Sequence, residues 1–505
     1  MSTTFDYVIV GAGSAGCVLA SRLSEQPDVS VLLLENGSRD VRPEVHDPTV
    51  WPTLMGSEID YGYRTTPQRE LGGVQVDWPR GRAIGGSSAI NGMVYLRGHR
   101  NDYDQWDRQG ATGWAFDDVL PYFRRMESVP TGDPRFRGTD GPMRPSQAQD
   151  PNPLSAVFLD AAGAVGHPTT ADFNAEIQEG AGWQDLSITG GRRQSVAGAY
   201  LTPAVLERQN LTVLTESRAV KLILRGSRCE GVRVQQANAV TDVLAAREVI
   251  VSCGAVDSPR LLLLSGIGPA DELRAVGVEV VHDAPGVGRN LHDHPLTSVV
   301  YEAKRVIPPG SANLSEAALL WRSDESLSGP DMQMQFVHVP LLQAGMQAPP
   351  NSFTLAVATV PDSRGTIRLQ DGDPDSLPLI DPRYLVEARD RRRLVRGVET
   401  ARAIVADGAF DDWRGAEVYP GAAVDGADDL EGFVRRGTGT YFHPVGTCVM
   451  GTGDDAVVAP DLRVRGVEHL RVVDASVMPR VPCVNTNVAT IMIAERGADL
   501  IRAGI

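Results

Sequence analysis

The apolar positions at the start of the chain form two short runs that flank a glycine-rich stretch. Residues 5–10 and 29–35 have the nearly continuous apolar character of strands buried on both faces. Between them, residues 17–25 place Val18, Leu19 and Leu23 on one face of an expected helix. The order strand, turn, helix, strand predicts a β–α–β unit in a parallel sheet.

Further along, the same patterns predict a return to this sheet. Aromatic and apolar residues at helical spacing predict a helix over residues 101–127, and Ser258 and Pro259 are candidates for the cap and first position of a helix over 260–264. Residues 36–60 and 128–190 are expected to be mostly loop. Strands are expected at 211–214, 219–224, 231–234, 248–251 and 470–474, and a last helix at 488–503.

The pattern changes between residues 296 and 439, where short apolar strands alternate with polar turns. This spacing is typical of an antiparallel sheet and predicts a second, α+β domain above the first. The expected strands are 298–301, 332–339, 353–360 and 366–369, and the expected helices are 387–406 and 427–436.

Composition narrows the class of protein. The 505 residues exceed one ordinary core, so two domains are expected. A net charge of −16 argues against nucleic acid as a partner. We find no signal peptide and no run long enough to span a bilayer, and the five scattered cysteines fit reduced thiols. These features predict a cytoplasmic protein.

The glycine-rich stretch at residues 11–16 reads G-A-G-S-A-G. Gly11 allows the tight turn, Gly13 lets a pyrophosphate approach the backbone, and Gly16 lets helix and strand pack closely. Glu35 ends the second strand, where a carboxylate can accept the ribose hydroxyls of an adenosine. The motif therefore predicts a dinucleotide, and it fits both NAD and FAD.

A second small-residue stretch, residues 81–92, reads GRAIGGSSAING. Its glycines permit close approach to a large flat ligand, and Ser87 and Asn91 supply hydrogen-bonding groups. The alternative is a flexible surface loop. The apolar residues within the stretch, and the MVYL that follows it, favour the ligand-binding interpretation.

Taken together, five segments resemble the glucose–methanol–choline (GMC) flavoprotein oxidoreductases, in the branch of choline dehydrogenases and of aryl-alcohol and hydroxymethylfurfural oxidases. The resemblance runs nearly end to end and includes both long glycine-containing motifs in their usual order. The segments are residues 11–35, 81–92, 254–269, the N-L-H-D-H-P at 290–295, and the C-terminal stretch containing His443, Asp474 and Asn485.

The resemblance implies an α/β FAD-binding Rossmann-like domain and an α+β substrate domain with an antiparallel sheet. It assigns residues 1–125, 192–296 and 441–505 to the FAD domain, and 126–191 and 297–440 to the substrate domain. Ile90 stands where some members attach FAD to a histidine, so noncovalent FAD is expected. The expected FAD contacts are Gly11, Gly13, Ser14, Ala15, Gly16, Glu35, Arg82, Gly85, Gly86, Ser87, Asn91, Gly92, Met93, Val94, Val220, Asp474, Ala475, Asn485, Thr486 and Asn487.

The chemistry that the resemblance implies is oxidation of an alcohol, expected to be primary, to the carbonyl. His443 is the candidate general base and Asn485 its partner for the developing alkoxide. Tyr441, Phe442, Met334 and Phe336 are expected to line an apolar pocket, which favours an aromatic or aliphatic alcohol over a sugar. The electron acceptor is either O2 or another carrier.

Two other activities occur on the same scaffold, and the sequence leaves them open. One is a lyase that cleaves cyanohydrins, and the other is a light-driven decarboxylase. The segment between Asn313 and Met332 looks shorter than in choline dehydrogenases, which indicates either a more open pocket or a loop deletion with no effect on substrate.

A metal site is not expected. His292, Asp293 and His294 lie together in the sequence, but consecutive residues of a strand do not supply three convergent ligands, and no further His/Cys cluster completes a site. The resemblance instead makes this stretch a structural connection near the flavin.

Overall fold

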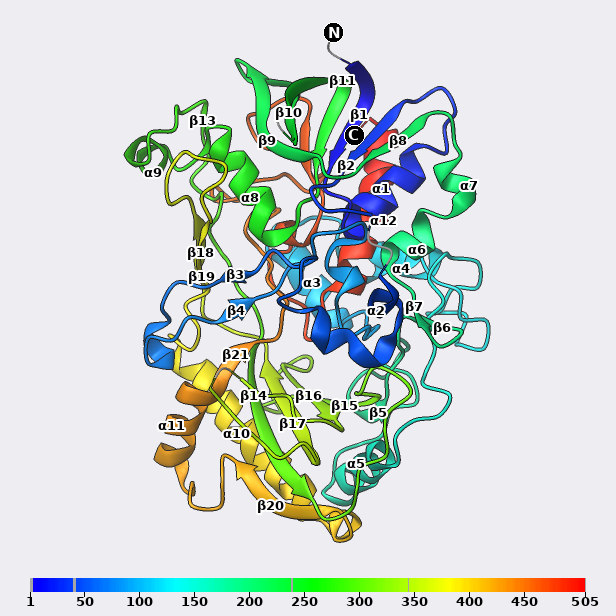
Figure 1. Cartoon of the computed structure of the whole chain (residues 1–505), viewed down its shortest axis with the longest axis vertical. Coiled ribbons are helices and arrows are strands. Elements are labelled where there is room, and N and C mark those ends of the chain that lie inside the picture. The colour runs from blue at the N-terminus through cyan, green and yellow to red at the C-terminus, as the bar shows by residue number, and fades with distance from the viewer. Residues whose placement is uncertain (1–2, 40–41, 238, 344, 505) are drawn as a thin grey trace.

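A computed structural model describes residues 3–39, 42–237, 239–343 and 345–504. Two lobes, each built on a seven-stranded sheet, are stacked along the long axis of the molecule (Figure 1). The expected combination of a Rossmann-like α/β lobe and an α+β lobe is confirmed. The exact segments predicted for the two domains stay a prediction.

The first sheet contains the strands expected from the opening β–α–β unit. β1 is parallel to both β2 and β11, with Val8 opposite Leu32 and Val249, whereas β10 pairs antiparallel with β11 and with β9. The strand order is β8 (Leu211–Leu214), β2 (Val31–Leu34), β1 (Thr3–Val10), β11 (Ala239–Val251), β10 (Arg228–Gln236) and β9 (Arg218–Arg225), with β22 (Leu470–Val472) paired to β11.

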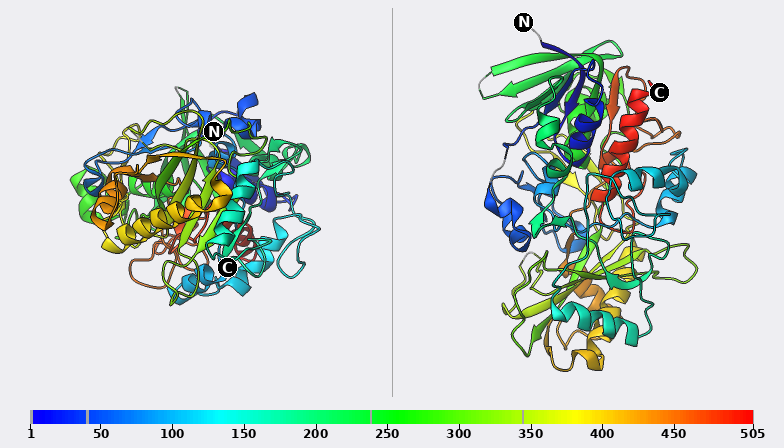
Figure 2. Two further views of the ribbon diagram at one scale, coloured as in Figure 1. Left: turned by 90° about the horizontal axis from the view of Figure 1, so that it is seen from below. Right: turned by 90° about the vertical axis from the view of Figure 1, so that its right-hand side faces the viewer.

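Two helices from opposite ends of the sequence pack side by side on this sheet. α1 (Ser14–Leu23) and α12 (Asn487–Arg502) are joined by a 2.6 Å hydrogen bond from Ser14 Oγ to Asn487 Oδ1 and by a 2.8 Å ion pair between Arg22 and the buried Glu495. Both chain ends consequently lie in the same lobe (Figure 2).

The second sheet is antiparallel throughout. α10 (Ala388–Ala406), α5 (Pro153–Ala164) and α11 (Ala427–Gly437) pack on its far side, so its other face turns toward the first lobe (Figures 1 and 2). The strand order is β20 (Arg414–Tyr419), β14 (Pro295–Ala303), β17 (Ser352–Thr359), β16 (Met332–Val337), β15 (Ala317–Trp321) and β5 (Gly180–Trp183), with β21 (Thr438–Thr440) paired to β14.

Short elements occupy the segments between these larger helices and strands. The helical ones are α2 (Pro43–His46), η1 (Pro48–Leu54), η2 (Arg69–Leu71), η3 (Gly86–Ala89), α6 (Val196–Tyr200), α7 (Pro203–Leu206), α9 (Ala270–Ala275), η4 (Gly408–Phe410) and η5 (Ala475–Val477). The two-stranded ribbons are β3 (Tyr63–Arg64) with β4 (Asp77–Trp78), β6 (Ile188–Thr189) with β7 (Arg192–Arg193), β12 (Ile267–Gly268) with β13 (His282–Asp283), and β18 (Thr366–Arg368) with β19 (Leu379–Asp381).

The single helix expected over residues 101–127 is wrong. The structure has two helices, α3 (Arg100–Arg108) and α4 (Phe116–Arg125). Gly110 and Gly113 lie between them with φ values of +99° and +84°, which is a conformation that interrupts a right-handed helix. Apolar residues continue at helical spacing across the break because α3 and α4 each bury an apolar, aromatic face.

The helix expected over residues 260–264 begins earlier than predicted, and its predicted cap is wrong. α8 runs over Gly254–Leu264, so Pro259 lies inside it. A proline in that position leaves the carbonyl of Ala255 without its helical donor. The hydroxyl of Thr447 donates to this carbonyl at 2.7 Å and makes the interior proline tolerable.

Three further predictions differ from the structure. The strand expected at 366–369 is β18 (Thr366–Arg368), which pairs with β19 in a separate ribbon and not with the large antiparallel sheet. Part of the expected loop at 128–190 is the helix α5, and part of 36–60 is α2 and η1. Strands β5, β15 and β20 were not predicted.

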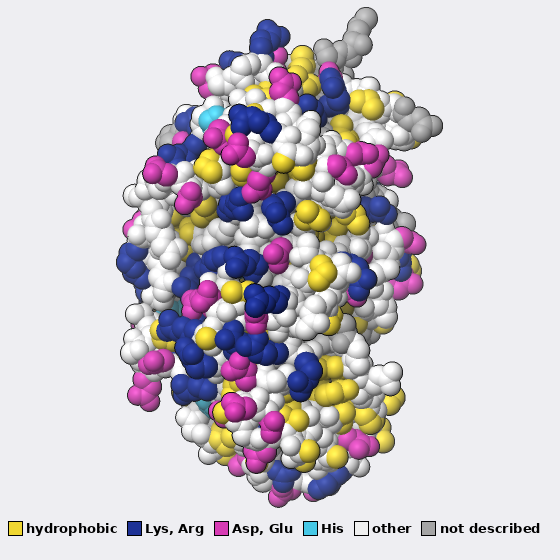
Figure 3. Space-filling model, turned by 90° about the vertical axis from the view of Figure 1, so that its left-hand side faces the viewer, with side chains coloured by type: hydrophobic (Ala, Val, Ile, Leu, Met, Phe, Trp, Pro, Cys, Tyr) yellow, Lys and Arg dark blue, Asp and Glu magenta, His cyan; other side chains and the backbone are white. Residues whose placement is uncertain are grey.

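The surface mixes charges of both signs. Arginine and lysine side chains gather in the middle of the face at the left of Figure 1, with acidic side chains between them (Figure 3). β3, β4 and α11 lie at the left of Figure 1. In them Arg64 pairs with Asp77 at 2.7 Å and Arg435 with Glu431 at 3.0 Å. In the described part of the chain, no helix has the length and apolar character needed to cross a bilayer.

Candidate active site

A cavity of about 470 Å³ lies between the two lobes and is lined by segments from the whole length of the chain. Most of the residues predicted to contact FAD or substrate come together here. They are Gly11, Gly13, Ser14, Ala15, Glu35, Arg82, Gly86, Ser87, Asn91, Gly92, Met93, Val94, Tyr441, Phe442, His443, Asp474, Ala475, Asn485, Thr486 and Asn487.

At one end of the cavity, the glycine turn brings strands and helix into direct contact. A Cβ atom on Gly16 would lie 1.8 Å from the carbonyl oxygen of Gly11, and one on Gly86 would lie 2.7 Å from Cα of Gly13. A Cβ on Gly13 would meet only Cα of Gly86, at 4.0 Å, and would otherwise occupy the cavity. The space at the start of α1 therefore suits a phosphate group, which the N–H groups of the first helical turn can bind.

Glu35 is held at the carboxyl end of β2 by main-chain donors. The N–H of Ala12 donates to its Oε2 at 2.9 Å and the N–H of Gly37 to its Oε1 at 2.7 Å. Burial raises the pKa of Glu35 to about 7, although these N–H groups oppose the shift. A diol binding beside Glu35 would add donors and favour the ionised carboxylate.

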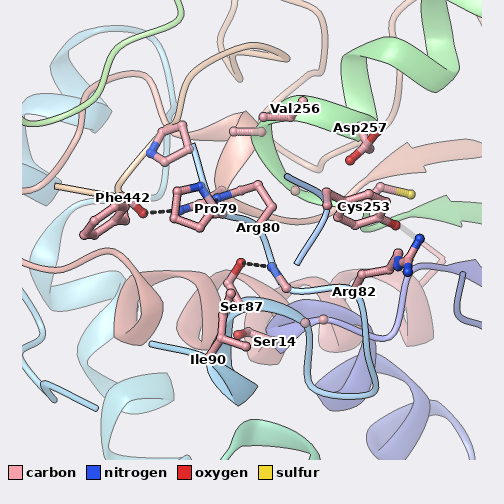
Figure 4. A pocket seen from close by; sticks show the side chains of 18 of the residues that line it. Ser14, Pro79, Arg80, Arg82, Ser87, Ile90, Cys253, Val256, Asp257 and Phe442 are labelled. Atoms are coloured by element: carbon pink, nitrogen blue, oxygen red, sulfur yellow. Dashed lines mark hydrogen bonds between the residues drawn. The ribbon is translucent and has the colours of Figure 1, made fainter. Parts of the chain in front are cut away.

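Residues 79–92 reach both ends of the cavity, because Arg80 contacts Phe442 and Gly86 lies against the glycine turn at Gly13 (Figure 4 shows Arg80 and Phe442). The N–H of Gly81 donates to Ser87 Oγ at 3.2 Å, which folds this stretch on itself. The guanidinium of Arg80 donates to the carbonyl of Phe442 at 2.7 Å, as Figure 4 shows. Arg80 therefore places a half-buried positive charge next to the segment that carries His443.

His443 and Asn485 meet at this opposite end. Asn485 Nδ2 lies 3.1 Å from His443 Nε2, and Asn485 Oδ1 accepts a 3.1 Å hydrogen bond from Gln333 Nε2. Because Gln333 occupies the amide oxygen, the amide nitrogen faces the imidazole. Nε2 of His443 then carries the lone pair that accepts a proton.

His294 determines where the other proton of His443 is. The two Nδ1 atoms are 3.0 Å apart. Since His443 Nε2 accepts from Asn485, its Nδ1 is protonated and donates to Nδ1 of His294. Burial lowers the pKa of His294 to about 3, and burial, His294 and Arg80 together lower the pKa of His443 well below its ordinary value. Both rings are neutral near pH 7.

Asp293 holds the main chain around His443 in place. Its carboxylate accepts hydrogen bonds from the N–H of His443 at 2.7 Å, from Thr440 Oγ1 at 2.6 Å and from the hydroxyl of Tyr384. Phe442, between these anchors, has φ of +66°, a strained conformation for a residue other than glycine. Asp293 stabilises this turn and fixes the direction of the imidazole.

The prediction that Met334 and Phe336 line the pocket is wrong. Both are buried in the core beneath the second sheet, where Phe336 stacks on Phe158 with ring centroids 5.2 Å apart. Side chains alternate across a strand, so the opposite face of β16 carries Gln333, Gln335 and Val337. Of these, Gln335 and Val337 line the cavity.

Three predicted FAD contacts do not line the cavity in the described part of the chain. Gly16 and Gly85 shape the turns around it, and Val220 lies beside Arg218 and Ala219, which do line it. Their direct contact with FAD stays a prediction.

His292 and its neighbours are engaged within the protein. Nδ1 of His292 lies 2.6 Å from the carbonyl of Asn290, and its Nε2 accepts from the N–H of Val481 at 2.9 Å. Among the described residues, no group of three or more His, Cys, Asp or Glu side chains could hold a metal ion.

Comparison with known proteins identifies the family. The model of the N-terminal part of the GMC oxidoreductases matches residues 5–296, and that of the C-terminal part matches residues 361–494. The chain belongs to the GMC oxidoreductases. These are FAD-binding flavoproteins, and this member is accordingly an FAD-dependent oxidoreductase that acts on CH–OH groups, as the resemblance predicted.

Individual GMC relatives cover nearly the full chain. Oxygen-dependent choline dehydrogenase of Brucella anthropi is 40% identical, with 98% of this chain and 95% of the relative covered. Mitochondrial choline dehydrogenase of Homo sapiens is 40% identical, with 99% and 90% covered. The crystal structure of pyridoxine 4-oxidase from Mesorbium loti is similar with a TM-score of 0.96, 37% identity and 99% of each chain covered.

The residues present fit the cofactor of a GMC oxidoreductase. The glycine turn leaves room for a pyrophosphate and Glu35 can accept two hydroxyls, while the N-terminus of α12 at Asn487 opens on the same cavity. A positive helix end there suits an electron-rich ring system.

Several functional positions were missed from the sequence. The sequence assigns Asp293 and His294 only to a connection near the flavin. It places Gln333 and Gln335 in a strand that could line an apolar pocket, without a polar role of their own, and it gives no role to Arg80. A signal existed for the glutamines, because two polar residues that alternate with Met and Phe in a buried strand need hydrogen-bond partners.

Proposed function

We propose that this protein oxidises a primary alcohol to the aldehyde, with Nε2 of His443 as the general base. The observation that carries the proposal is the 3.1 Å approach of Asn485 Nδ2 to His443 Nε2 at the end of the cavity. A hydroxyl within reach of both groups would donate to the imidazole and accept from the amide. The amide would then stabilise the developing alkoxide.

The protonation states support this assignment. With its pKa lowered by burial, His443 is unprotonated near neutrality and can accept the substrate proton. Its Nδ1–H, donated to His294, keeps the ring oriented while Nε2 receives the proton. Bound FAD supplies the acceptor for the hydride that leaves the neighbouring carbon.

For the substrate we propose a neutral aromatic primary alcohol. Tyr441, Phe442 and Trp51 line the cavity, and the Tyr441 ring packs on the His443 ring with centroids 4.4 Å apart. The pyridoxine oxidase relative acts, by its name, on an aromatic alcohol.

Choline is disfavoured by the charges around the cavity. The acidic side chains that line the described cavity already have partners in the nucleotide-binding part. For example, Asp375 forms an ion pair with Arg218, and Asp474 accepts a hydrogen bond from the N–H of Gly254. A quaternary ammonium near His443 would therefore lack a counter-ion and would lie close to Arg80.

The test is anaerobic reduction of the purified yellow protein by benzylic alcohols and by choline, followed by admission of air. We expect a benzylic alcohol to bleach the flavin, and reoxidation in air would identify O2 as an acceptor. Reduction by choline alone would contradict the substrate proposal. Cyanide release from a cyanohydrin, or light-dependent decarboxylation of a fatty acid, without bleaching by any alcohol would favour the lyase or decarboxylase alternative.

His443→Ala tests the assigned base. We expect FAD to be retained and kcat/KM to fall about 10²- to 10⁴-fold, the usual contribution of general-base catalysis. Unchanged reduction by the alcohol would contradict the assignment.

We further propose that FAD is held noncovalently. Ile90 lines the cavity at the position where some family members attach the flavin, and an isoleucine side chain forms no such bond. Acid precipitation should leave the yellow colour in the supernatant, and colour in the pellet would contradict noncovalent binding.

A further inference from the structure

The amide of Gln335 is buried at the substrate end of the cavity and has an unused donor. The residue is 3% exposed and lines the cavity, and no described residue forms a hydrogen bond of good geometry with its Nε2. The nearby hydroxyl of Tyr441 can engage at most one of the two N–H groups, which leaves the other for a ligand. Buried polar groups are nearly always paired, so an unpaired amide in a binding cavity indicates a missing ligand atom.

The orientation of this amide follows from one main-chain carbonyl. Nε2 of Gln184 donates at 2.7 Å to the carbonyl oxygen of Ser315, which can only accept. The same Nε2 lies 2.8 Å from Gln335, so the atom of Gln335 that faces it is the oxygen. The hydroxyl of Ser315 also donates to that oxygen, at 3.1 Å.

With its oxygen occupied twice, Gln335 can present only its NH₂ group to a ligand. Gln184 is fully buried and Ser315 nearly so, which holds the amide in this orientation. The amide cannot turn over without placing two donors against each other.

Gln335 is close to the reacting end of the cavity. It is two residues from Gln333, on the same face of β16, and Gln333 contacts Asn485. The hydroxyl of Tyr441 lies beside the amides of Gln335 and Asn485, while its ring packs on His443. A ring bound against Tyr441 could therefore reach His443 with its CH₂OH group and Gln335 with another substituent.

We propose that Gln335 is a specificity-determining residue that selects aromatic alcohols carrying a hydrogen-bond acceptor, such as an unprotonated ring nitrogen or a ring oxygen. This inference rests on the proposed function and adds the chemical feature that the substrate must have. A substrate without the acceptor leaves the Gln335 N–H groups unpaired and binds less well.

The test compares benzyl alcohol with the three pyridylmethanols, which have nearly the same shape and differ in a ring nitrogen. At a pH where this nitrogen is unprotonated, we expect the best pyridylmethanol to exceed benzyl alcohol in kcat/KM by about 10-fold or more. Equal values for all four alcohols would overturn the proposal. Failure of every alcohol to reduce the flavin would instead overturn the proposed function.

Gln335→Glu is the informative variant. The carboxylate keeps the size of the side chain and can still accept from Gln184 and Ser315, but it presents an acceptor to the ligand. We expect the preference for the pyridylmethanol to disappear while FAD stays bound. Gln26→Glu, the same change in the exposed turn after α1, is the matched control and should keep the preference.

A second variant covers the case in which Gln335→Glu loses FAD. Gln335→Met keeps a similar side-chain volume and removes the N–H groups. The ratio of kcat/KM for the best pyridylmethanol to that for benzyl alcohol should therefore fall to about one. Retention of the preference in a folded, FAD-containing variant at position 335 would overturn the role of Gln335.

Discussion

At the scale of single residues, the end of the cavity that contains His443 has a chain of hydrogen bonds in which each side chain donates to the next. Gln333 donates to Asn485, Asn485 to His443, and His443 to His294. Each side chain fixes the orientation or tautomer of the next. The basic lone pair of His443 therefore results from the whole chain, and changes remote from the substrate should alter it.

Gln333→Leu tests this directionality. Without the donor to its oxygen, the Asn485 amide is free to turn and place its oxygen toward the substrate, where it would repel an alkoxide. We expect kcat to fall about 10- to 100-fold with KM changed much less, because the lost interaction acts in the transition state. Stopped-flow measurement of flavin reduction checks this.

The matched control is Gln178→Leu, a buried glutamine that donates to main-chain carbonyls of Gly98 and Phe173 and does not line the cavity. It should affect stability more than the reduction rate. An equal loss of kcat in both variants would count against the orienting role of Gln333.

The pH dependence of kcat/KM follows from the lowered pKa of His443. A lowered pKa means that the imidazole stays unprotonated, and able to accept a proton, as the pH falls through its ordinary value of about 6.5. We expect kcat/KM to be flat down to that pH and to decline only below it. A steady-state profile with an acid limb centred at 6.5 or above would contradict this.

The residues of the proposed catalytic pair were predictable from the sequence, whereas the wall of the pocket was not. His443 and Asn485 lie in motifs with a fixed order. β16 is buried on both faces, so the alternation Met-Gln-Met-Gln-Phe does not reveal which face meets the cavity. The apolar face was assigned to the substrate, but it packs on the helices beneath the sheet.

At the scale of elements, close contacts between main chains decide where the cavity can form. α1 starts against β1 only because Gly16 lacks a Cβ atom, and the second glycine-rich segment touches the same turn at Gly86. The first turn of α1 was predictable because glycines at this spacing allow strand, turn and helix to come into close contact. The start of α8 was not, because its interior Pro259 depends on Thr447, almost 200 residues away.

Two glycine-to-alanine changes should have opposite effects. Gly16→Ala would place a Cβ 1.8 Å from the Gly11 carbonyl, and we expect loss of FAD binding together with destabilisation by several kcal/mol. Gly163→Ala, in the exposed last turn of α5 with no atom within 4 Å, should raise stability by about 0.5–1 kcal/mol.

Denaturant unfolding and FAD titration of both variants check this pair. A Gly16→Ala protein that binds FAD as the wild type does would contradict the close packing described for the turn. Destabilisation by Gly163→Ala would contradict its helical, uncrowded environment.

At the scale of the whole molecule, the cavity lies between the two lobes and is lined by residues of both. Its lining comes from residues between Val10 and Thr490, so FAD bound there would contact segments from both lobes. A ligand that binds only the folded state stabilises it by RT ln(1 + [L]/Kd), about 2.7 kcal/mol at 100 times Kd.

Removal of FAD should therefore lower the thermal unfolding temperature. We expect Tm of the apoprotein to fall by several degrees and to rise again with added FAD in a concentration-dependent manner, as calorimetry can record. AMP can occupy only the part of the cavity near Glu35, so it should restore less of the lost Tm than FAD does. A Tm independent of FAD would contradict a cofactor site between the lobes.

The pairing of α12 with α1 has a consequence for synthesis in the cell. The packing of α1 is completed by contacts with Asn487 and Glu495, and each of these residues is translated 473 residues after its partner in α1. A nascent chain lacks these contacts until α12 has been synthesised, so we expect flavin to be bound only after that point. A premature stop codon just ahead of α12 should accordingly yield a colourless polypeptide, however much flavin the host supplies.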